Sequence, residues 1–155
     1  MEDPPLDGVD LTTQGSLDWN HWGETGTVRN HKASGADQIG GYTEIVASGN
    51  PANSGKLITD LPFAFEWDAD GTPTASASDV RKGIVFIYSI PGTQLGNGFS
   101  LTLDANTTPR TLKLYVGAFD ATGKLTASLS DPGAVDAEVL VVNPVAQGLY
   151  KCITI

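Results

Sequence analysis

The stretch Phe63-Ala64-Phe65-Glu66-Trp67 decides the fold, because large apolar side chains alternate along it with small or charged ones. A period of two places Phe63, Phe65 and Trp67 on one face of an extended strand. The turn-forming residues Asp68-Ala69-Asp70-Gly71 follow at once and end the strand. The stretch therefore predicts a half-buried strand whose three aromatic side chains face a core.

The same alternation recurs along the whole chain, separated by turn residues about every 8–12 positions. It predicts about nine strands and no convincing helix, with a hairpin connection at Ala121-Thr122-Gly123-Lys124 and another turn at Asp131-Pro132-Gly133. The predicted strands are 38–48, 63–67, 74–78, 83–90, 99–103, 111–116, 125–129, 137–142 and 148–155. This pattern favours an all-β fold, a two-sheet antiparallel β-sandwich of jelly-roll-like type.

The length of 155 residues suits one domain. Residues 1–10 are acidic and proline-rich, which predicts a linker or an extended N-terminal segment. Residues 11–155 are then the single β-sandwich domain. One cysteine, Cys152, rules out a disulfide within the chain.

The net charge of −9 argues against nucleic acid as a partner, because phosphate binding requires a basic face. It also argues against anionic membrane surfaces, and no apolar run reaches the roughly 18 residues of a membrane helix. Neutral sugars, proteins and cations remain as candidate partners.

The residues of the chain also argue against an enzyme. Both histidines, His21 and His31, lie near the start, and no G-x-S-x-G motif accompanies them. Two histidines and one cysteine without metal-ligand spacing do not predict a zinc site. No pair of carboxylates stands in a recognisable catalytic motif, so we expect no catalytic residues.

Two longer motifs carry a family resemblance. They are Asp18-Trp19-Asn20-His21-Trp22-Gly23 and Thr111-Leu112-Lys113-Leu114-Tyr115-Val116-Gly117. Together they resemble a β-sandwich accessory module that is repeated in bacterial extracellular and cell-surface proteins, often near sugar-active or Ig-like domains. The resemblance covers about residues 9–155 and implies an accessory role such as carbohydrate binding. Pro109 interrupts the T-T-R-T run of such modules, which puts the conformation of one loop in doubt.

The first motif allows two interpretations. Trp19 and Trp22, with His21 between them, could form a platform on which the C–H face of a sugar stacks. Alternatively, one tryptophan closes the core and the motif fixes the first strand. Residues three apart in a strand face opposite ways, so we expect one tryptophan in the core and the other nearer the surface.

Two further groups could contact a ligand. Asn30 and His31 could donate hydrogen bonds, or they could belong to a buried anchor in which Asp18 pairs with Lys32 or Arg29. Tyr42, together with Tyr88 and Tyr115, could form an aromatic row on an outer sheet face, or these rings could simply pack within the sheet. We therefore predict Trp22, His21, Tyr42, Asn30 and His31 as ligand-binding residues.

A calcium site is the remaining candidate for a cofactor. Glu66, Asp68 and Asp70 alternate ahead of Gly71, as in a calcium-binding loop. The twelfth position of such a loop would be Ala77, where a bidentate glutamate is needed. We expect no required cofactor, with calcium as an option at these three carboxylates.

The sequence thus predicts a non-catalytic carbohydrate-binding or accessory module of an extracellular bacterial protein, with a polysaccharide or glycan as partner. The alternative is a structural or adhesive unit, a spacer or filament subunit that binds neighbouring domains or copies of itself by strand complementation. In that case the last predicted strand, residues 148–155, would add to a neighbour's sheet edge.

Overall fold

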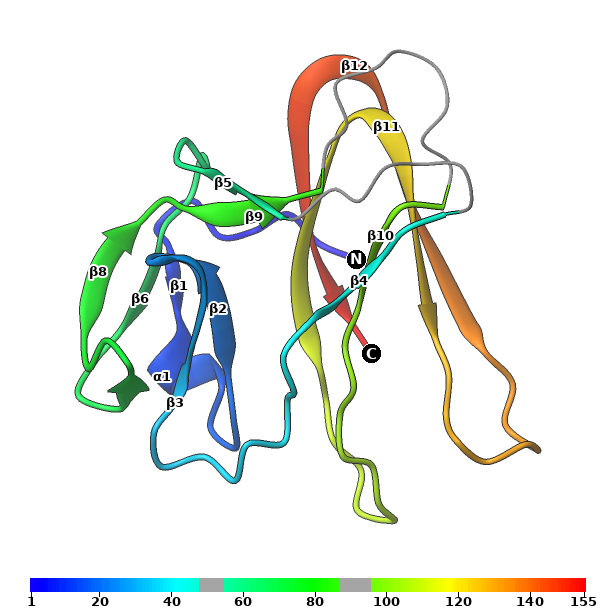
Figure 1. The fold of residues 1–155 in the computed structure, drawn as a ribbon, viewed down its shortest axis with the longest axis horizontal. Coiled ribbons are helices and arrows are strands. Elements are labelled where there is room, and N and C mark those ends of the chain that lie inside the picture. The colour runs from blue at the N-terminus through cyan, green and yellow to red at the C-terminus, as the bar shows by residue number, and fades with distance from the viewer. Residues whose placement is uncertain (48–54, 87–95) are drawn as a thin grey trace. The chain divides into compact units, whose positions relative to one another are not determined.

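The computed structural model describes residues 1–47, 55–86 and 96–155. Strands dominate these ranges, and the only helix in them is a single turn, α1 (Leu11–Gln14), so the predicted all-β class is confirmed (Figure 1). The chain divides into two compact units: a large unit, Leu6–Asp104, and a ribbon unit made of Met1–Pro5 and Ala105–Ile155. Within the described ranges no helix has the length and apolar character that crossing a membrane requires.

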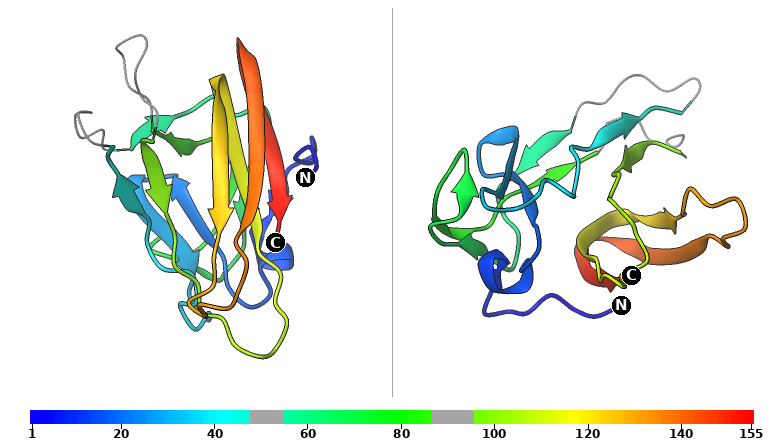
Figure 2. Two further views of the ribbon diagram at one scale, coloured as in Figure 1. Left: turned by 90° about the vertical axis from the view of Figure 1, so that its right-hand side faces the viewer. Right: turned by 90° about the horizontal axis from the view of Figure 1, so that it is seen from below.

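The described residues of the large unit form four small sheets, which can be followed from three directions in Figures 1 and 2. The strands β1 (Val9–Asp10) and β6 (Phe65–Trp67) run parallel, and the other strand pairs in these sheets are antiparallel. The sheets are β1 (Val9–Asp10), β6 (Phe65–Trp67) and β8 (Ala77–Val80); β2 (Asn20–Gly23), β3 (Gly26–Lys32) and β7 (Gly71–Thr72); β5 (Lys56–Ile58) and β9 (Gly83–Val85); and β4 (Thr43–Ile45) and β10 (Gly98–Ser100).

The core of the large unit is built on the alternating aromatic stretch, as predicted. Phe63, Phe65 and Trp67 are 4%, 7% and 2% exposed, whereas Glu66 between them is exposed. The Trp67 ring lies 5.3 Å from that of Trp19, measured between centroids. Burying aromatic side chains together contributes strongly to stability, so this cluster holds the surrounding small sheets in place.

The ribbon unit is one long antiparallel pair, β11 (Lys113–Ala127) and β12 (Ala137–Thr154). The predicted hairpin connection at Ala121–Lys124 is wrong, because these residues continue β11 and pair with 140–143 of β12. The register shifts only between Phe119 and Ala121. The chain reverses after β11, at the predicted turn Asp131-Pro132-Gly133, where the Asp131 carboxylate accepts the Gly133 N–H at 2.8 Å. The predicted strands 111–116 and 125–129 are therefore one strand, and so are 137–142 and 148–155.

The first ten residues contribute to both units. In the ribbon unit, Glu2 exchanges two backbone hydrogen bonds with Cys152, and Lys151 forms an ion pair with Asp3. In the large unit, Val9 pairs with Phe65 and is fully buried. Between these contacts Leu6 and Asp7 form a turn, and Val9 and Asp10 form the short strand β1.

The β2–β3 hairpin was missed in the list of predicted strands. Its connection uses left-handed backbone at Gly23 (φ 114°) and Gly26 (φ 64°). A Cβ at Gly23 would stand 2.6 Å from the backbone nitrogen of Gly83, so only glycine fits there without movement. This hairpin carries most of the residues predicted to bind a ligand.

Candidate functional site

The β2–β3 hairpin sorts the side chains of the first motif onto two faces. Successive side chains of a strand point to opposite sides of a sheet, and directly paired residues share a side. The inner face of the hairpin therefore carries His21 and Asn30. The outer face carries the other two register pairs. The register pairs are Asn20 with His31, His21 with Asn30, and Trp22 with Arg29.

The inner face turns two predicted ligand-binding residues into the interior of the large unit. His21 is 5% exposed, and its ring lies 4.9 Å from that of Phe65 and 5.5 Å from that of Trp67. Asn30 is fully buried, and its side-chain oxygen accepts the backbone N–H of Thr74 at 3.1 Å. In this position both side chains anchor the core and are removed from solvent.

Burial fixes the protonation state of His21. Loss of hydration lowers the pKa of the imidazole from 6.5 to about 4, against the opposing effect of its contact with the Lys82 carbonyl. That carbonyl lies 3.2 Å from Nε2 and can only accept, so Nε2 carries the proton and Nδ1 is left as an acceptor. Nδ1 has no hydrogen-bond partner among the described residues. His21 is therefore neutral near pH 7.

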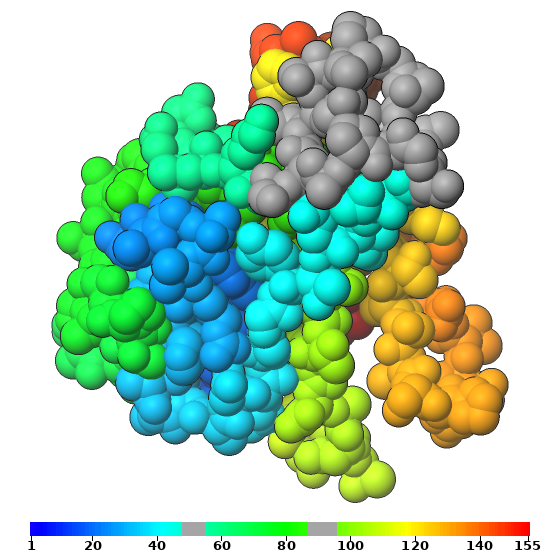
Figure 3. Space-filling view, in the orientation of Figure 1, coloured from blue at the N-terminus to red at the C-terminus, as the bar shows by residue number. Residues whose placement is uncertain are grey.

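The outer face forms one wall of an open hollow of about 570 Å³. Trp22 and Tyr42 are both half-buried, and their rings meet edge to face with centroids 5.9 Å apart. In the space-filling view, the cyan 37–42 segment lies beside the blue β2–β3 hairpin (Figure 3). The expected division of the two tryptophans is confirmed, since Trp19 is 2% exposed while Trp22 reaches this surface. The residues that line the hollow are Trp22, Thr27, Arg29, Asp37, Gly40, Gly41 and Tyr42.

An ion pair forms the polar part of the hollow. The Arg29 guanidinium lies 2.7 Å from the Asp37 carboxylate and also donates to the Ile39 carbonyl at 2.8 Å. The hydrogen bond from Arg29 lowers the pKa of Asp37, so the carboxylate stays ionised. Asp37 has left-handed backbone (φ 51°), which Asp and Asn tolerate better than other non-glycine residues.

The segment that carries Asp37 is tied to the hairpin by polar side chains. Asn20 donates to the carbonyls of Ile39 and Gly40, at 2.8 and 3.2 Å. Asp18 accepts the Ile39 N–H at 3.0 Å and the Trp19 N–H at 2.8 Å. These bonds hold the wall of the hollow in a defined position, which favours recognition by pre-organised groups.

The orientation of Tyr42 is set by further aromatic rings. Its ring meets Phe86 edge to face at 5.4 Å, and Phe86 stacks on Phe99 at 5.2 Å. Of the predicted tyrosine row, Tyr88 lies outside the described residues and Tyr115 belongs to β11 in the ribbon unit. The row of three tyrosines thus stays a prediction. Tyr42 itself packs against Trp22 and Phe86.

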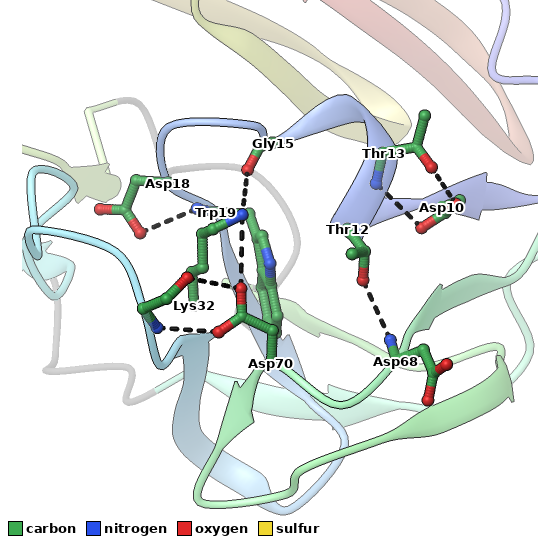
Figure 4. A network of polar contacts seen from close by, with 10 residues as sticks. Asp10, Thr12, Thr13, Gly15, Asp18, Trp19, Lys32, Asp68 and Asp70 are labelled. Atoms are coloured by element: carbon green, nitrogen blue, oxygen red, sulfur yellow. Dashed lines mark hydrogen bonds and ion pairs between the residues drawn. The ribbon is translucent and has the colours of Figure 1, made fainter.

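The predicted pairing of Asp18 with Lys32 or Arg29 is wrong. Lys32 instead donates to the Gly15 carbonyl at 3.2 Å and lies 3.4 Å from Asp70 (Figure 4). Asp18 needs no cation because two backbone N–H groups satisfy its carboxylate. His31, also predicted to bind a ligand, is half-buried opposite Asn20, and its Nδ1 has no partner in the described ranges.

The three predicted calcium ligands have separate protein partners or solvent around them. Asp70 accepts the N–H and the hydroxyl of Ser34 at 2.8 and 2.6 Å, which lowers the pKa of its carboxyl group. Asp68 accepts the Ser76 hydroxyl at 3.0 Å, and Glu66 is exposed on β6. No group of three metal-binding side chains occurs among the described residues. Calcium binding stays a prediction.

Sequence reasoning missed five members of the site, which are Thr27, Arg29, Asp37, Gly40 and Gly41. The only signal for Asp37 was its residue type, since aspartate adopts left-handed backbone at turns. Thr27 gives no signal of its own, because its place depends on the hairpin register.

No protein-family model, curated protein or solved structure matches this chain.

Proposed function

We propose that this protein is a non-catalytic carbohydrate-binding module of an extracellular bacterial protein, and that the hollow beside β2–β3 is its glycan site. One observation carries the proposal: the half-buried rings of Trp22 and Tyr42 line the same hollow as the Arg29–Asp37 ion pair. The resemblance of the Asp18–Gly23 motif to a bacterial extracellular module supports the same setting.

The lining matches the two chemical faces of a sugar. Apolar C–H groups of a pyranose ring stack on an aromatic face, such as that of Trp22. Hydroxyl groups need donors and acceptors fixed in direction, and Arg29 and Asp37 supply one of each kind. Gly40 and Gly41 add backbone without side chains, so a ligand can approach closely. A few placed polar groups within an apolar wall are typical of small-ligand sites.

Replacing Trp22 with alanine is expected to weaken glycan binding by about 30-fold or more, as for a central aromatic anchor worth about 2 kcal/mol. The measurement is affinity electrophoresis in gels that contain neutral polysaccharides, with titration calorimetry on any glycan retained. Phe119→Ala is the matched control, because Phe119 is 58% exposed and belongs to the ribbon unit.

The proposal fails if the wild-type protein binds no glycan either in these gels or on a glycan array. It also fails if Phe119→Ala loses as much affinity as Trp22→Ala, because the aromatic ring in the hollow would then have no special role. Circular dichroism of each variant checks that the fold is intact.

A second candidate function, assembly through strand complementation, is favoured by the ribbon unit. Among the described residues, β11 and β12 pair with each other and otherwise only with Glu2, so long sheet edges are left open. Leu140 and Val142 on β12 are 55% and 56% exposed. Open edges with exposed apolar side chains pair readily with another chain.

Under this second candidate, Val142→Lys is expected to shift a concentration-dependent oligomer to monomer, because a lysine on the strand opposes pairing with a neighbour. Light scattering coupled to size exclusion, over a roughly hundredfold range of concentration, measures the shift. Val135→Lys is the control, since Val135 is 94% exposed and lies outside both strands. A wild-type protein that stays monomeric throughout argues against assembly.

The two-sheet, jelly-roll-like sandwich remains a proposal beside these functions. It is supported by the all-β content, although each sheet of the described residues holds only two or three strands. Calcium at Glu66, Asp68 and Asp70 is likewise an optional part of the proposal, and binding of a glycan at the hollow requires no cofactor.

A further inference from the structure

We propose that Asp37 makes the hollow selective for uncharged glycans, by neutralising the cation that would otherwise attract an acidic sugar. The inference rests on the proposed function of the hollow. It goes further in naming the chemical class of the ligand and the residue that selects it.

The charges of the lining are the first step. Of the described residues that line the hollow, Arg29 is the only cation and Asp37 the only anion. Their charged groups are 2.7 Å apart, so the pair presents no net charge to a ligand. The Asp37 side chain is 59% exposed and that of Arg29 is 22% exposed, so a ligand that enters meets the carboxylate first.

The second step concerns what an acidic sugar would meet. Its carboxylate would have to displace Asp37 from Arg29 or to lie close beside a like charge, which costs free energy. The net charge of −9 adds a repulsion that acts at longer range and is screened by salt. A neutral sugar meets neither penalty, and its hydroxyls can bond to both members of the pair.

The third step is that Arg29 does not depend on Asp37 for its position. Its guanidinium also donates to the Ile39 carbonyl, which is itself held by Asn20. Asparagine tolerates the left-handed backbone of Asp37 and has nearly the same shape. Asp37→Asn therefore removes the negative charge and leaves the positive charge of Arg29 in place to attract an anion.

The experiment measures retardation of the full chain in gels containing neutral polysaccharides (arabinoxylan, mannan and mixed-linkage β-glucan) or polyuronates (polygalacturonate and alginate). The wild-type protein is expected to bind at least one neutral polymer and none of the polyuronates. Asp37→Asn is expected to gain polyuronate affinity by about tenfold or more at low salt, and to lose the gain as salt is raised.

Asp79→Asn is the matched control. Asp79 also has left-handed backbone (φ 50°) and pairs with an arginine, Arg81, at 2.8 Å, but it does not line the hollow. It removes the same charge from the chain, so any effect of net charge appears in both variants. Only Asp37→Asn is expected to bind polyuronates.

The outcomes separate the two proposals. If the wild type binds no polymer, the proposed function fails and the inference fails with it. If the wild type binds a neutral polymer through Trp22 but also binds polyuronates equally well, only the inference is overturned. The inference is also overturned if Asp37→Asn keeps the selectivity of the wild type or behaves like Asp79→Asn, provided that circular dichroism shows the variant to be folded.

Discussion

Replacing Trp67 with alanine is expected to lower the free energy of unfolding of the large unit by about 3–5 kcal/mol, enough to unfold many single domains. The side chain is 2% exposed and packs against the rings of Trp19 and His21, with centroid distances of 5.3 and 5.5 Å. Its indole N–H donates to the Thr74 carbonyl at 2.9 Å. The substitution removes the buried ring, leaves a cavity and takes away the donor for that carbonyl.

Urea denaturation followed by far-ultraviolet circular dichroism measures this effect. Trp22→Ala is the matched control, because it deletes the same side chain from a half-buried position on the opposite side of the hairpin. We expect Trp22→Ala to keep most of the stability and to lose glycan binding. Equal stability of Trp67→Ala and Trp22→Ala would contradict the placement of Trp67 at the centre of the core.

Acid is expected to destabilise the large unit as the pH falls from about 6.5 to about 4, by up to about 3 kcal/mol. Burial lowers the pKa of His21 in the folded state to about 4, whereas in the unfolded chain it is near 6.5. Between these two pKa values, His21 binds a proton in the unfolded state but not in the folded state. The contribution of neutral His21 to the free energy of unfolding is fully present above pH 6.5 and is lost progressively as the pH falls to about 4.

The pH window separates His21 from the carboxylates. Asp10, Glu24, Asp37 and Asp70 have pKa values lowered from 3.8 or 4.5, so most of their contribution is lost below about pH 4.5, at the acid end of the His21 window and beyond it. Urea midpoints measured in steps between pH 7 and pH 4 record the loss. His21→Gln is expected to flatten this profile. An unchanged profile in His21→Gln would refute the assignment.

Local side-chain patterning was sufficient to predict much of the core. The alternation of Phe63, Phe65 and Trp67 defines a buried face because side chains of a strand point alternately to its two sides. The spacing of Trp19 and Trp22 separates one core ring from one surface ring for the same reason. These properties depend on neighbouring residues only, so they can be derived from the sequence without knowledge of the tertiary structure.

One of the turns predicted in the second half of the chain could not be derived this way, whereas the turn predicted at Asp131-Pro132-Gly133 is present. Ala121-Thr122-Gly123-Lys124 has the composition of a turn, yet Gly123 is extended and faces Val141 in the β11–β12 ladder. Turn composition allows a reversal but does not require one. Where the partner strand continues in register, pairing of the backbone with β12 outweighs the local preference of these residues.

The sequence by itself determined the class of the fold, the aromatic core and the role of Trp22 as a candidate contact. Only the tertiary structure decided that Arg29 pairs with Asp37, that the pair shares a hollow with Trp22 and Tyr42, and that His21 and Asn30 are buried. The physical reason is that ion pairs and hollows join segments through backbone turns. Those turns bring together residues whose separation along the chain carries no periodic pattern.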